Sequence, residues 1–183
     1  VGEVGSSLAM FAILENISTI AAQQNAVLNG ETVRNAVIKA NELLIAHNTR
    51  TGENTGATIV MALTSPDGKT AIAQVGDARA YKIKSDGSVA MLTKDQSLVF
   101  RLAGMAEGVL PSDYLKHPQR NGIYGQLGEV MDPSRINVYE GDDIDLKNGD
   151  RLILGCDALW ESAASERGEL TPEAKTILGE IDA

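Results

Sequence analysis

The pattern of apolar positions changes once along the chain, from a helical period to short runs. The segment Ser6–Ile20 is apolar nearly all round, which predicts a well-buried helix with Ser6 or Ser7 as its cap. Within Glu31–His47 the apolar positions recur at steps of three and four, which predicts a second helix with one buried face. The positions on that face are Val33, Val37, Ala40 and Leu44. We expect the two helices to pack together on an outer face of the domain.

Beyond the polar stretch NTRTGENTG, short aliphatic runs predict strands. SPDG and SDG supply residues that turns require, so the first four strands are expected to form an antiparallel meander. A helix is predicted in DQSLVFRLAGMAEG, a short strand in DIDL, and a last helix in TPEAKTILGEI with Thr171 as cap. This succession predicts an α+β domain with helices outside and sheet inside. The other predicted strands are Ala57–Thr64, Thr70–Val75, Arg79–Lys84, Val89–Thr93, Ile136–Glu140 and Arg151–Gly155.

Composition and charge exclude several function classes. The 183 residues fit one domain and carry a net charge of −9. Nucleic acid and anionic membranes are therefore poor partners, because binding them requires a basic face. No apolar run approaches the ~18 residues of a membrane span, since Glu15 and Asn16 interrupt SSLAMFAILENI, which also lacks the basic flank of a signal peptide. The single cysteine, Cys156, fits a reducing compartment, and we expect a cytoplasmic protein.

Acidic residues are the candidates for chemistry, because the chain has no glycine-rich phosphate loop and no CxxC or GxSxG motif. Its two histidines, His47 and His117, do not have metal-ligand spacing, which argues against a zinc site or a serine triad. Sites made only of carboxylate oxygens suit Mg²⁺ and Mn²⁺. The acidic residues singled out are Asp77, Asp95, Asp157 and Glu161.

Asp157 follows an apolar strand and Glu161 lies four residues on, so the two can present carboxylates to one cation, with Asp77 as a third. Each residue also has a structural interpretation. Gly-Asp between strands is mostly a turn signal, and an aspartate after a strand is commonly the cap of the next helix. Asp95 before QSLV is most simply a cap or turn residue.

Taken in order, the segments TGATIVMAL, AQVGDARAYKI, LTKDQS and GDRLILGCDALWE resemble the metal-dependent protein phosphatase (PPM, type 2C) family. VGEVGSSLAMFAI is similar to the helix that follows the family's Asp-Gly-x-Gly-Gly-His segment. LKHPQRNGIYGQLGEVMDPSRINVYEGDDIDLKNGD is similar to the bacterial-style stretch before the last motif. The resemblance covers Val1 to about Glu161, and it implies two antiparallel sheets sandwiched between helices (α-β-β-α).

The resemblance also implies a function, the hydrolysis of phosphoserine or phosphothreonine in a phosphoprotein substrate, with two Mg²⁺ or Mn²⁺ ions that activate a water. Asp157 matches a metal ligand of the family. Asp77 and Glu161 match positions that hold a further, weaker cation in some members, whereas Arg79 matches a motif position without a metal role. We expect the carboxylates of Asp77 and Asp157 to lie roughly 4 to 6 Å apart, as two ligands of one Mg²⁺ would.

The sequence departs from the family pattern in several places. The Asp-Gly-x-Gly-Gly-His segment would lie before Val1 and a late Asp-Asn pair would follow Ala183, so we expect a domain incomplete at both ends and no appreciable activity of this chain alone. Two alternatives remain open: a catalytically silent phosphatase-fold domain that binds a protein partner, and an acidic interaction domain whose carboxylates are caps and turns. The substituted positions are Ala158 for Gly, Ala78 for Ser, Gln96 for His and Cys156 for Ser.

Overall fold

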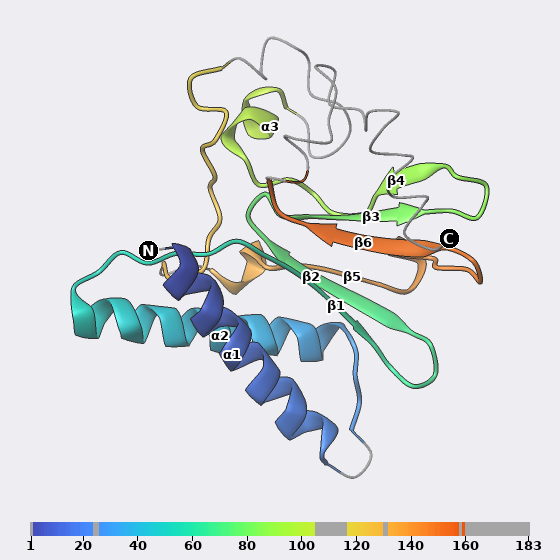
Figure 1. Ribbon diagram of the computed structural model, residues 1–183, viewed down its shortest axis with the longest axis horizontal. Coiled ribbons are helices and arrows are strands. Elements are labelled where there is room, and N and C mark those ends of the chain that lie inside the picture. The colour runs from blue at the N-terminus through green and yellow to red at the C-terminus, as the bar shows by residue number, and fades with distance from the viewer. Residues whose placement is uncertain (1, 24–25, 105–116, 130–131, 158, 160–183) are drawn as a thin grey trace. The chain divides into compact units, whose positions relative to one another are not determined.

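The chain forms two compact units, one made of Val1–Gly76 with Gly125–Asp145 (unit 1) and one of Asp77–Tyr124 with Leu146–Ala183 (unit 2). The computed structural model describes residues 2–23, 26–104, 117–129, 132–157 and 159 (Figure 1). Unit 1 contains α1 (Gly2–Ala21), α2 (Gly30–Thr51), β1 (Ile59–Thr64), β2 (Thr70–Val75), β5 (Asn137–Glu140) and the 3₁₀ turns Pro133–Arg135 and Gly141–Asp143. Unit 2 contains β3 (Arg79–Ile83), β4 (Val89–Met91), α3 (Leu98–Leu102) and β6 (Arg151–Gly155).

Helix α2 forms where the sequence predicted it, and its ends are capped. Asn29 Oδ1 accepts a hydrogen bond from Thr32 N at 3.1 Å, and Thr32 Oγ1 accepts one from Asn29 N at 3.3 Å, which makes a capping box. At the other end Gly52 takes the left-handed conformation that commonly ends helices. The predicted face is confirmed, since Val33, Val37, Ala40 and Leu44 are all fully buried.

Helix α1 packs against α2 through a few buried residues. Its buried positions are Gly5, Ala9, Ala12 and Ile13, of which the last three belong to the same apolar core as α2, whereas Gly5 lies close to Thr55 and Gly56. The prediction that α1 is buried on nearly all sides is wrong, because other apolar side chains of this helix are exposed to solvent. Phe11 is 61% and Leu14 59% exposed.

The start of α1 also differs from the prediction. The helix is already formed at Gly2, and the hydroxyl of Ser6 donates to the carbonyl of Glu3 inside it instead of capping it. Within the described part of the chain, α1 is also the one helix whose length and composition would let it cross a membrane, a test that core helices of soluble proteins pass as well. The expectation that the protein does not enter a membrane therefore stays a prediction.

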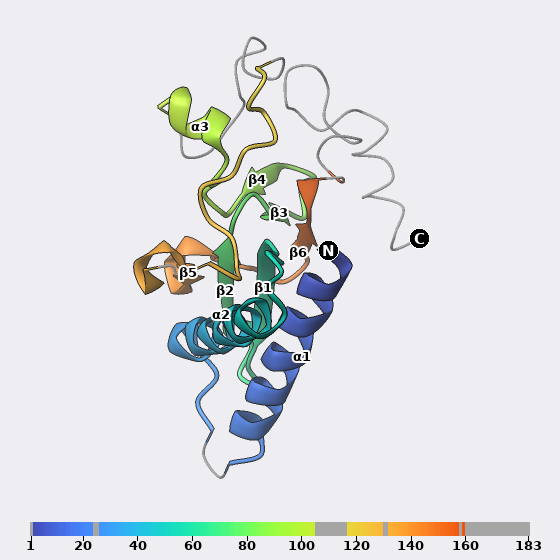
Figure 2. The same ribbon diagram turned by 90° about the vertical axis from the view of Figure 1, so that its left-hand side faces the viewer.

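The sheet of unit 1 is antiparallel, with strand order β1-β2-β5, and α2 lies against one of its faces (Figure 2). Ala71, Ala73 and Val75 of β2 belong to the same apolar core as α2, so the alternate residues Ile72 and Gln74 point to the opposite face. Small alanines on the helix-facing side let α2 approach the sheet closely.

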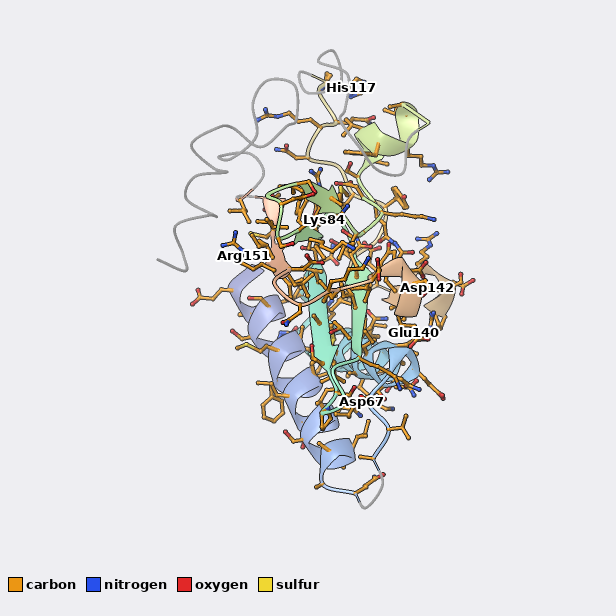
Figure 3. The ribbon with its side chains drawn as sticks, turned by 90° about the vertical axis from the view of Figure 1, so that its right-hand side faces the viewer. Asp67, Lys84, His117, Glu140, Asp142 and Arg151 are labelled. Carbon is orange, nitrogen blue, oxygen red and sulfur yellow. The ribbon has the colours of Figure 1, made fainter. Side chains whose placement is uncertain are left out.

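One carboxylate links this sheet to the start of α2. Glu140 at the end of β5 accepts a hydrogen bond from Gly30 N at 2.7 Å (Figure 3 labels Glu140 next to this helix). A negative charge at a helix N-terminus is favourable, because the first N–H groups there have no partner within the helix.

The sheet of unit 2 is also antiparallel, with β3 between its two partners in the order β4-β3-β6. The SDG turn joins β3 and β4, and Gly87 N donates to Lys84 O at 2.9 Å across it. On the other side of β3, the last pair of the ladder joins Arg79 to Gly155 of β6. The prediction of an α+β fold with two antiparallel sheets and helices is confirmed.

Three expectations for the elements fail. The first four strands do not form one meander, because β2 and β3 belong to different sheets and the Gly-Asp between them joins two sheets instead of forming a hairpin. DIDL forms no strand, since a 3₁₀ turn at Gly141–Asp143 and a left-handed Asp145 (φ 41°) interrupt an extended conformation there. The helix predicted in DQSLVFRLAGMAEG spans only Leu98–Leu102 in the part the structure describes. The helix expected from Thr171 lies outside the described residues.

Candidate functional site

Asp77 occupies the point where the chain leaves one sheet and enters the other. Gly76, directly before it, has a φ of +92°, and a Cβ there would lie 2.5 Å from the side chain of Thr58. Glycine is therefore required for both the dihedral angle and the space. Local sterics therefore fix the turn that presents Asp77. The interpretation of Gly-Asp as a hairpin turn is wrong, because β2 and β3 belong to different sheets.

The ladders of unit 2 place two other aspartates beside Asp77. Asp77 lies two residues before Arg79 and Asp157 lies two residues after Gly155, so both stand equally far beyond the last pair of β3 and β6. On the other side, counting outward from Tyr81 paired with Met91 leads to Asp77 opposite Asp95. Continuing the register beyond the paired residues therefore leads to Asp77, Asp95 and Asp157 at one end of this sheet.

The electrostatics of Asp77 agree with this placement. Burial, and next the negative charge of Asp95, raise the pKa of Asp77 to about 6, and the charge of Asp157 adds to the rise. A hydrogen bond from the backbone N–H of Asp77 and the charge of Arg79 act in the opposite direction. A carboxylate whose pKa is raised partly by neighbouring negative charges favours an added cation.

Asp95 differs from the other two because a guanidinium holds it. Its side chain is fully buried, and Oδ2 accepts from Arg79 Nε at 2.8 Å and lies 2.6 Å from Nη2 of the same residue. Its second oxygen, Oδ1, accepts from Ser97 N at 2.7 Å. The interpretation of Asp95 as a turn residue ahead of α3 is confirmed by that last bond. Its pairing with Arg79 is a second role that the sequence analysis missed.

The guanidinium of Arg79 is itself held by neighbours. Its Cζ lies 5.3 Å from the centroid of the Phe100 ring, which is a cation–π geometry, and Nη1 donates to the hydroxyl of Tyr81 at 3.3 Å. Only 16% of the Arg79 side chain is exposed. A signal for this pair was present in the sequence, since counting outward from the SDG turn brings Asp95 opposite Asp77, two residues before Arg79 begins β3.

The remaining predicted site residues are Asp157 and Glu161. Asp157 is exposed and lies just after β6, at the same end of the sheet as Asp77. Glu161 lies outside the described residues. The distance of 4 to 6 Å between the carboxylates of Asp77 and Asp157 stays a prediction, as does the assignment of each residue as a metal ligand.

The donor set has the right chemistry for a hard divalent cation. Asp77 and Asp157 offer only oxygen atoms, which Mg²⁺ and Mn²⁺ prefer, and Mg²⁺ is commonly bound by one or two carboxylates together with waters. In the described ranges, no three histidine, cysteine or acidic side chains are grouped so that they could hold a metal ion. The proposed site therefore rests on the chemistry of Asp77 and Asp157 and on the register that leads to them. His47, by contrast, lies in unit 1, where its ring faces Glu53 at 3.1 Å.

A separate hollow lies at the other end of β3, beyond Ile83. It has a volume of about 540 Å³, and none of the predicted metal ligands lines it. Its walls carry two cations, Lys84 and Arg151, both labelled in Figure 3. Both oxygens of its carboxylate, Asp150, accept from backbone N–H groups, those of Ser85 and Lys147. This hollow and the acidic end of the sheet are different features of unit 2.

Comparison with known proteins gives a consistent result. The family model described as Protein phosphatase 2C matches residues 2–99. The serine/threonine phosphatase stp of Listeria innocua is 29% identical over 125 residues, which cover 68% of this chain and 47% of that protein. The chain thus spans about half the length of this curated relative.

Solved structures support the same fold. The PPM Ser-Thr phosphatase MsPP from Mycobacterium smegmatis, in complex with cacodylate, has a TM-score of 0.66 and 24% identity, covering 88% of this chain and 64% of that one. The catalytic domain of the phosphatase PstP in complex with two manganese ions also has a TM-score of 0.66, with 21% identity over 99% of this chain and 74% of that one. At these identities the likeness shows the fold.

Proposed function

Because this chain belongs to the protein phosphatase 2C family, we propose that the protein carrying it hydrolyses phosphoserine and phosphothreonine in proteins, with Mg²⁺ or Mn²⁺ bound by Asp77 and Asp157. Glu161, four residues after Asp157, is proposed as a further, weaker ligand. The observation that supports the site best is the register of unit 2, which leads to Asp77 and Asp157 at the same end of β3 and β6.

A divalent cation at this position would neutralise phosphate charge and lower the pKa of a bound water. The chain's own residues prepare the site for it. Burial, and next the charge of Asp95 with a smaller contribution from Asp157, raise the pKa of Asp77, so a cation bound there would relieve part of this cost. Strand β6, paired with β3 from Arg151 to Gly155, holds the backbone that leads into Asp157. Rigid ligands lose little entropy when the metal binds.

The substrate class follows from the family and from the charge of the protein. A net charge of −9 disfavours nucleic acid as a substrate, and a phosphorylated side chain approaches such a surface most easily where a metal ion supplies positive charge. We therefore propose a phosphoprotein as the partner.

The test is hydrolysis of a phosphoserine peptide, a phosphothreonine peptide and p-nitrophenyl phosphate by the full-length protein, with and without Mn²⁺ or Mg²⁺. We expect turnover only with metal, and a loss on the order of 10²-fold or more in Asp157→Ala, because transition-state charge is no longer stabilised. Asp142→Ala is the matched control, since it removes an exposed aspartate from the 3₁₀ turn of unit 1 and should retain full activity. Hydrolysis that persists in chelator, or an Asp157→Ala variant as active as the control, would contradict the proposal.

A further inference from the structure

Asparagine is followed by glycine at three places in the chain, Asn29, Asn121 and Asn148. In such a dipeptide the backbone nitrogen of glycine can attack Cγ of the asparagine side chain, because glycine has no Cβ to hinder the approach. The N–Cγ bond forms, the bond from Cγ to the side-chain nitrogen breaks, and ammonia leaves with the proton of the glycine N–H. Water then opens the succinimide to aspartate or isoaspartate, so the net change is the hydrolysis of one amide without a redox step.

The structure protects Asn29 at both reacting groups. Its Oδ1 accepts from Thr32 N at 3.1 Å, which holds the side chain as the cap of α2. The nitrogen of Gly30 donates to the carboxylate of Glu140 at 2.7 Å, and Gly30 is buried. For this nitrogen to attack Cγ, both hydrogen bonds must open and the first turn of α2 must unfold.

Asn121 is exposed, but the glycine that follows it is held in place. Gly122 N donates to Gln119 O at 2.9 Å, and Gly122 O accepts from Leu98 N at 2.7 Å. A Cβ on this glycine would lie 2.5 Å from Leu98 Cδ1, so the backbone packs closely against α3. The nitrogen that would attack is therefore a hydrogen-bond donor in a packed turn, and its rotation toward the side chain breaks that bond.

The third pair, Asn148 and Gly149, lacks both kinds of protection. Both residues are exposed, and neither the nitrogen of Gly149 nor the side chain of Asn148 has a hydrogen-bond partner among the described residues. They form the centre of a turn in which Asp150 N donates to Lys147 O at 3.0 Å, and Gly149 has a φ of +90°. Gly149 and Asp150 also line the hollow of about 540 Å³, through which water reaches the turn.

We propose that Asn148 is the preferred site of spontaneous deamidation in this protein, and that the fold protects Asn29 and Asn121. Conversion adds a carboxylate two residues before Asp150, and the isoaspartate product also lengthens the main chain inside the turn that closes between Lys147 and Asp150. The turn precedes β6, whereas Asp157 follows it, so the modification lies apart from the proposed metal site and does not depend on the proposed function.

The experiment follows the three asparagines in one sample of the full-length protein. The protein is incubated at mildly alkaline pH and digested at acidic pH, and mass spectrometry resolves the exchange of NH₂ for OH in each peptide. In the folded protein Asn148 should convert on the order of tenfold faster than Asn29 or Asn121, because those two sites must first open hydrogen bonds. In guanidinium chloride the three rates should converge, since all three dipeptides are then exposed.

Replacing Glu140 tests the protection of Asn29 directly. In Glu140→Ala the nitrogen of Gly30 loses its acceptor, so Asn29 should convert severalfold faster while Asn148 keeps its wild-type rate. Glu140→Gln is the matched control, because it retains an acceptor oxygen and should keep Asn29 slow. A rate at Asn29 that is the same in both variants and in the wild type would contradict the role given to this hydrogen bond.

Two further results would overturn the inference. Equal rates at the three sites in the folded protein would show that the fold protects none of them. An order of rates that stays the same in denaturant would show that the flanking sequence, and not the structure, sets the rates. Asn148→Gln locates the reaction, because glutamine forms its larger ring slowly, and a mass gain that persists in this peptide would place the reaction at another residue.

Discussion

Units 1 and 2 bury different kinds of side chain. The apolar core that unites α1, α2 and the β1-β2-β5 sheet lies wholly within unit 1, and alanine and valine dominate it. In unit 2 the buried residues include as many polar as apolar side chains among those described. The polar and charged ones are Lys82, Thr93, Asp95, Gln96 and Ser97, and the apolar ones are Ala78, Ala80, Ile83, Val99 and Phe100.

This difference indicates that unit 1 mainly stabilises the fold, whereas unit 2 positions the polar side chains of the proposed metal site. Burying apolar surface is favourable at about 25 cal/mol per Å², whereas a buried ion pair offers little net stability because both charges lose their hydration. The Arg79–Asp95 pair is better explained by the orientation it imposes than by any contribution to stability. Substitutions in the two units should therefore differ in size, in pH dependence and in their effect on metal binding.

The largest expected effect on stability is that of Arg79→Met. Without the guanidinium, the carboxylate of Asp95 remains buried beside Asp77, and breaking a buried pair in this way costs about 3–5 kcal/mol. Urea denaturation in EDTA measures this cost, and hydrogen exchange should show the faster opening in unit 2. Arg120→Met, an exposed arginine of the same unit, is the control and should change stability by less than about 0.5 kcal/mol. Equal effects in the two variants would refute the importance of the buried pair.

Leu44→Ala is the corresponding change in unit 1. Leu44 is fully buried in the apolar core, and removing its side chain should cost about 2–4 kcal/mol, because a cavity remains between α2 and the sheet. The affinity for Mn²⁺ should stay at the wild-type value in the folded protein. A changed affinity would show that the core of unit 1 controls the proposed metal site, against the division drawn above.

Asp77→Asn should stabilise the metal-free protein at high pH. The pKa of Asp77 is raised to about 6 from the ordinary value of 3.8, mainly by burial, so the folded state prefers the protonated form. Its ionisation costs nothing below about pH 4, and the full cost is present above about pH 6. The variant should therefore gain about 1–2 kcal/mol at pH 8, after allowance for partial exposure, and nothing at pH 4. Denaturation curves in EDTA across this pH range measure the difference.

The matched control for that experiment is Asp86→Asn, whose effect on the free energy of unfolding should have the opposite sign. Hydrogen bonds from Ser88 lower the pKa of Asp86, so the ionised form of this exposed carboxylate is favoured in the folded state. Asp86→Asn should remove a small stabilisation that is present above pH 4 and is lost as the pH falls below it. A gain in stability at pH 8 in both variants would mean that net charge, and not the environment of Asp77, is responsible.

The smallest effect is expected for Leu14→Ala, the same substitution as in Leu44→Ala. Leu14 is 59% exposed on α1, so its truncation should change the free energy of unfolding by less than about 0.5 kcal/mol. Thermal denaturation of the two variants side by side tests whether burial accounts for the difference. A cost for Leu14→Ala as large as that for Leu44→Ala would show that this face of α1 is covered in the protein in solution.

Much of the local structure could be predicted from the sequence. The strands Thr70–Val75 and Arg151–Gly155 have the predicted bounds, because runs of aliphatic residues between turn-forming residues specify strands locally. The buried face of α2 follows from the period of its apolar residues in the same way. The order of the motifs also indicated the correct family, since it depends on residue types and spacing alone.

The tertiary structure decided what the local pattern leaves open. The burial of α1 depends on which elements pack against it, so the exposure of an apolar residue such as Phe11 could not be predicted from the sequence. The strand pattern around Gly76 is the same for a hairpin and for a passage between two sheets, and only the pairing of β3 with β6 distinguished them. Sequence determined that Asp77, Asp95 and Asp157 end or follow strands. Only long-range strand pairing leads the three toward one end of the sheet, and only the tertiary structure pairs Arg79 with Asp95, because a carboxylate's role depends on which charges lie beside it.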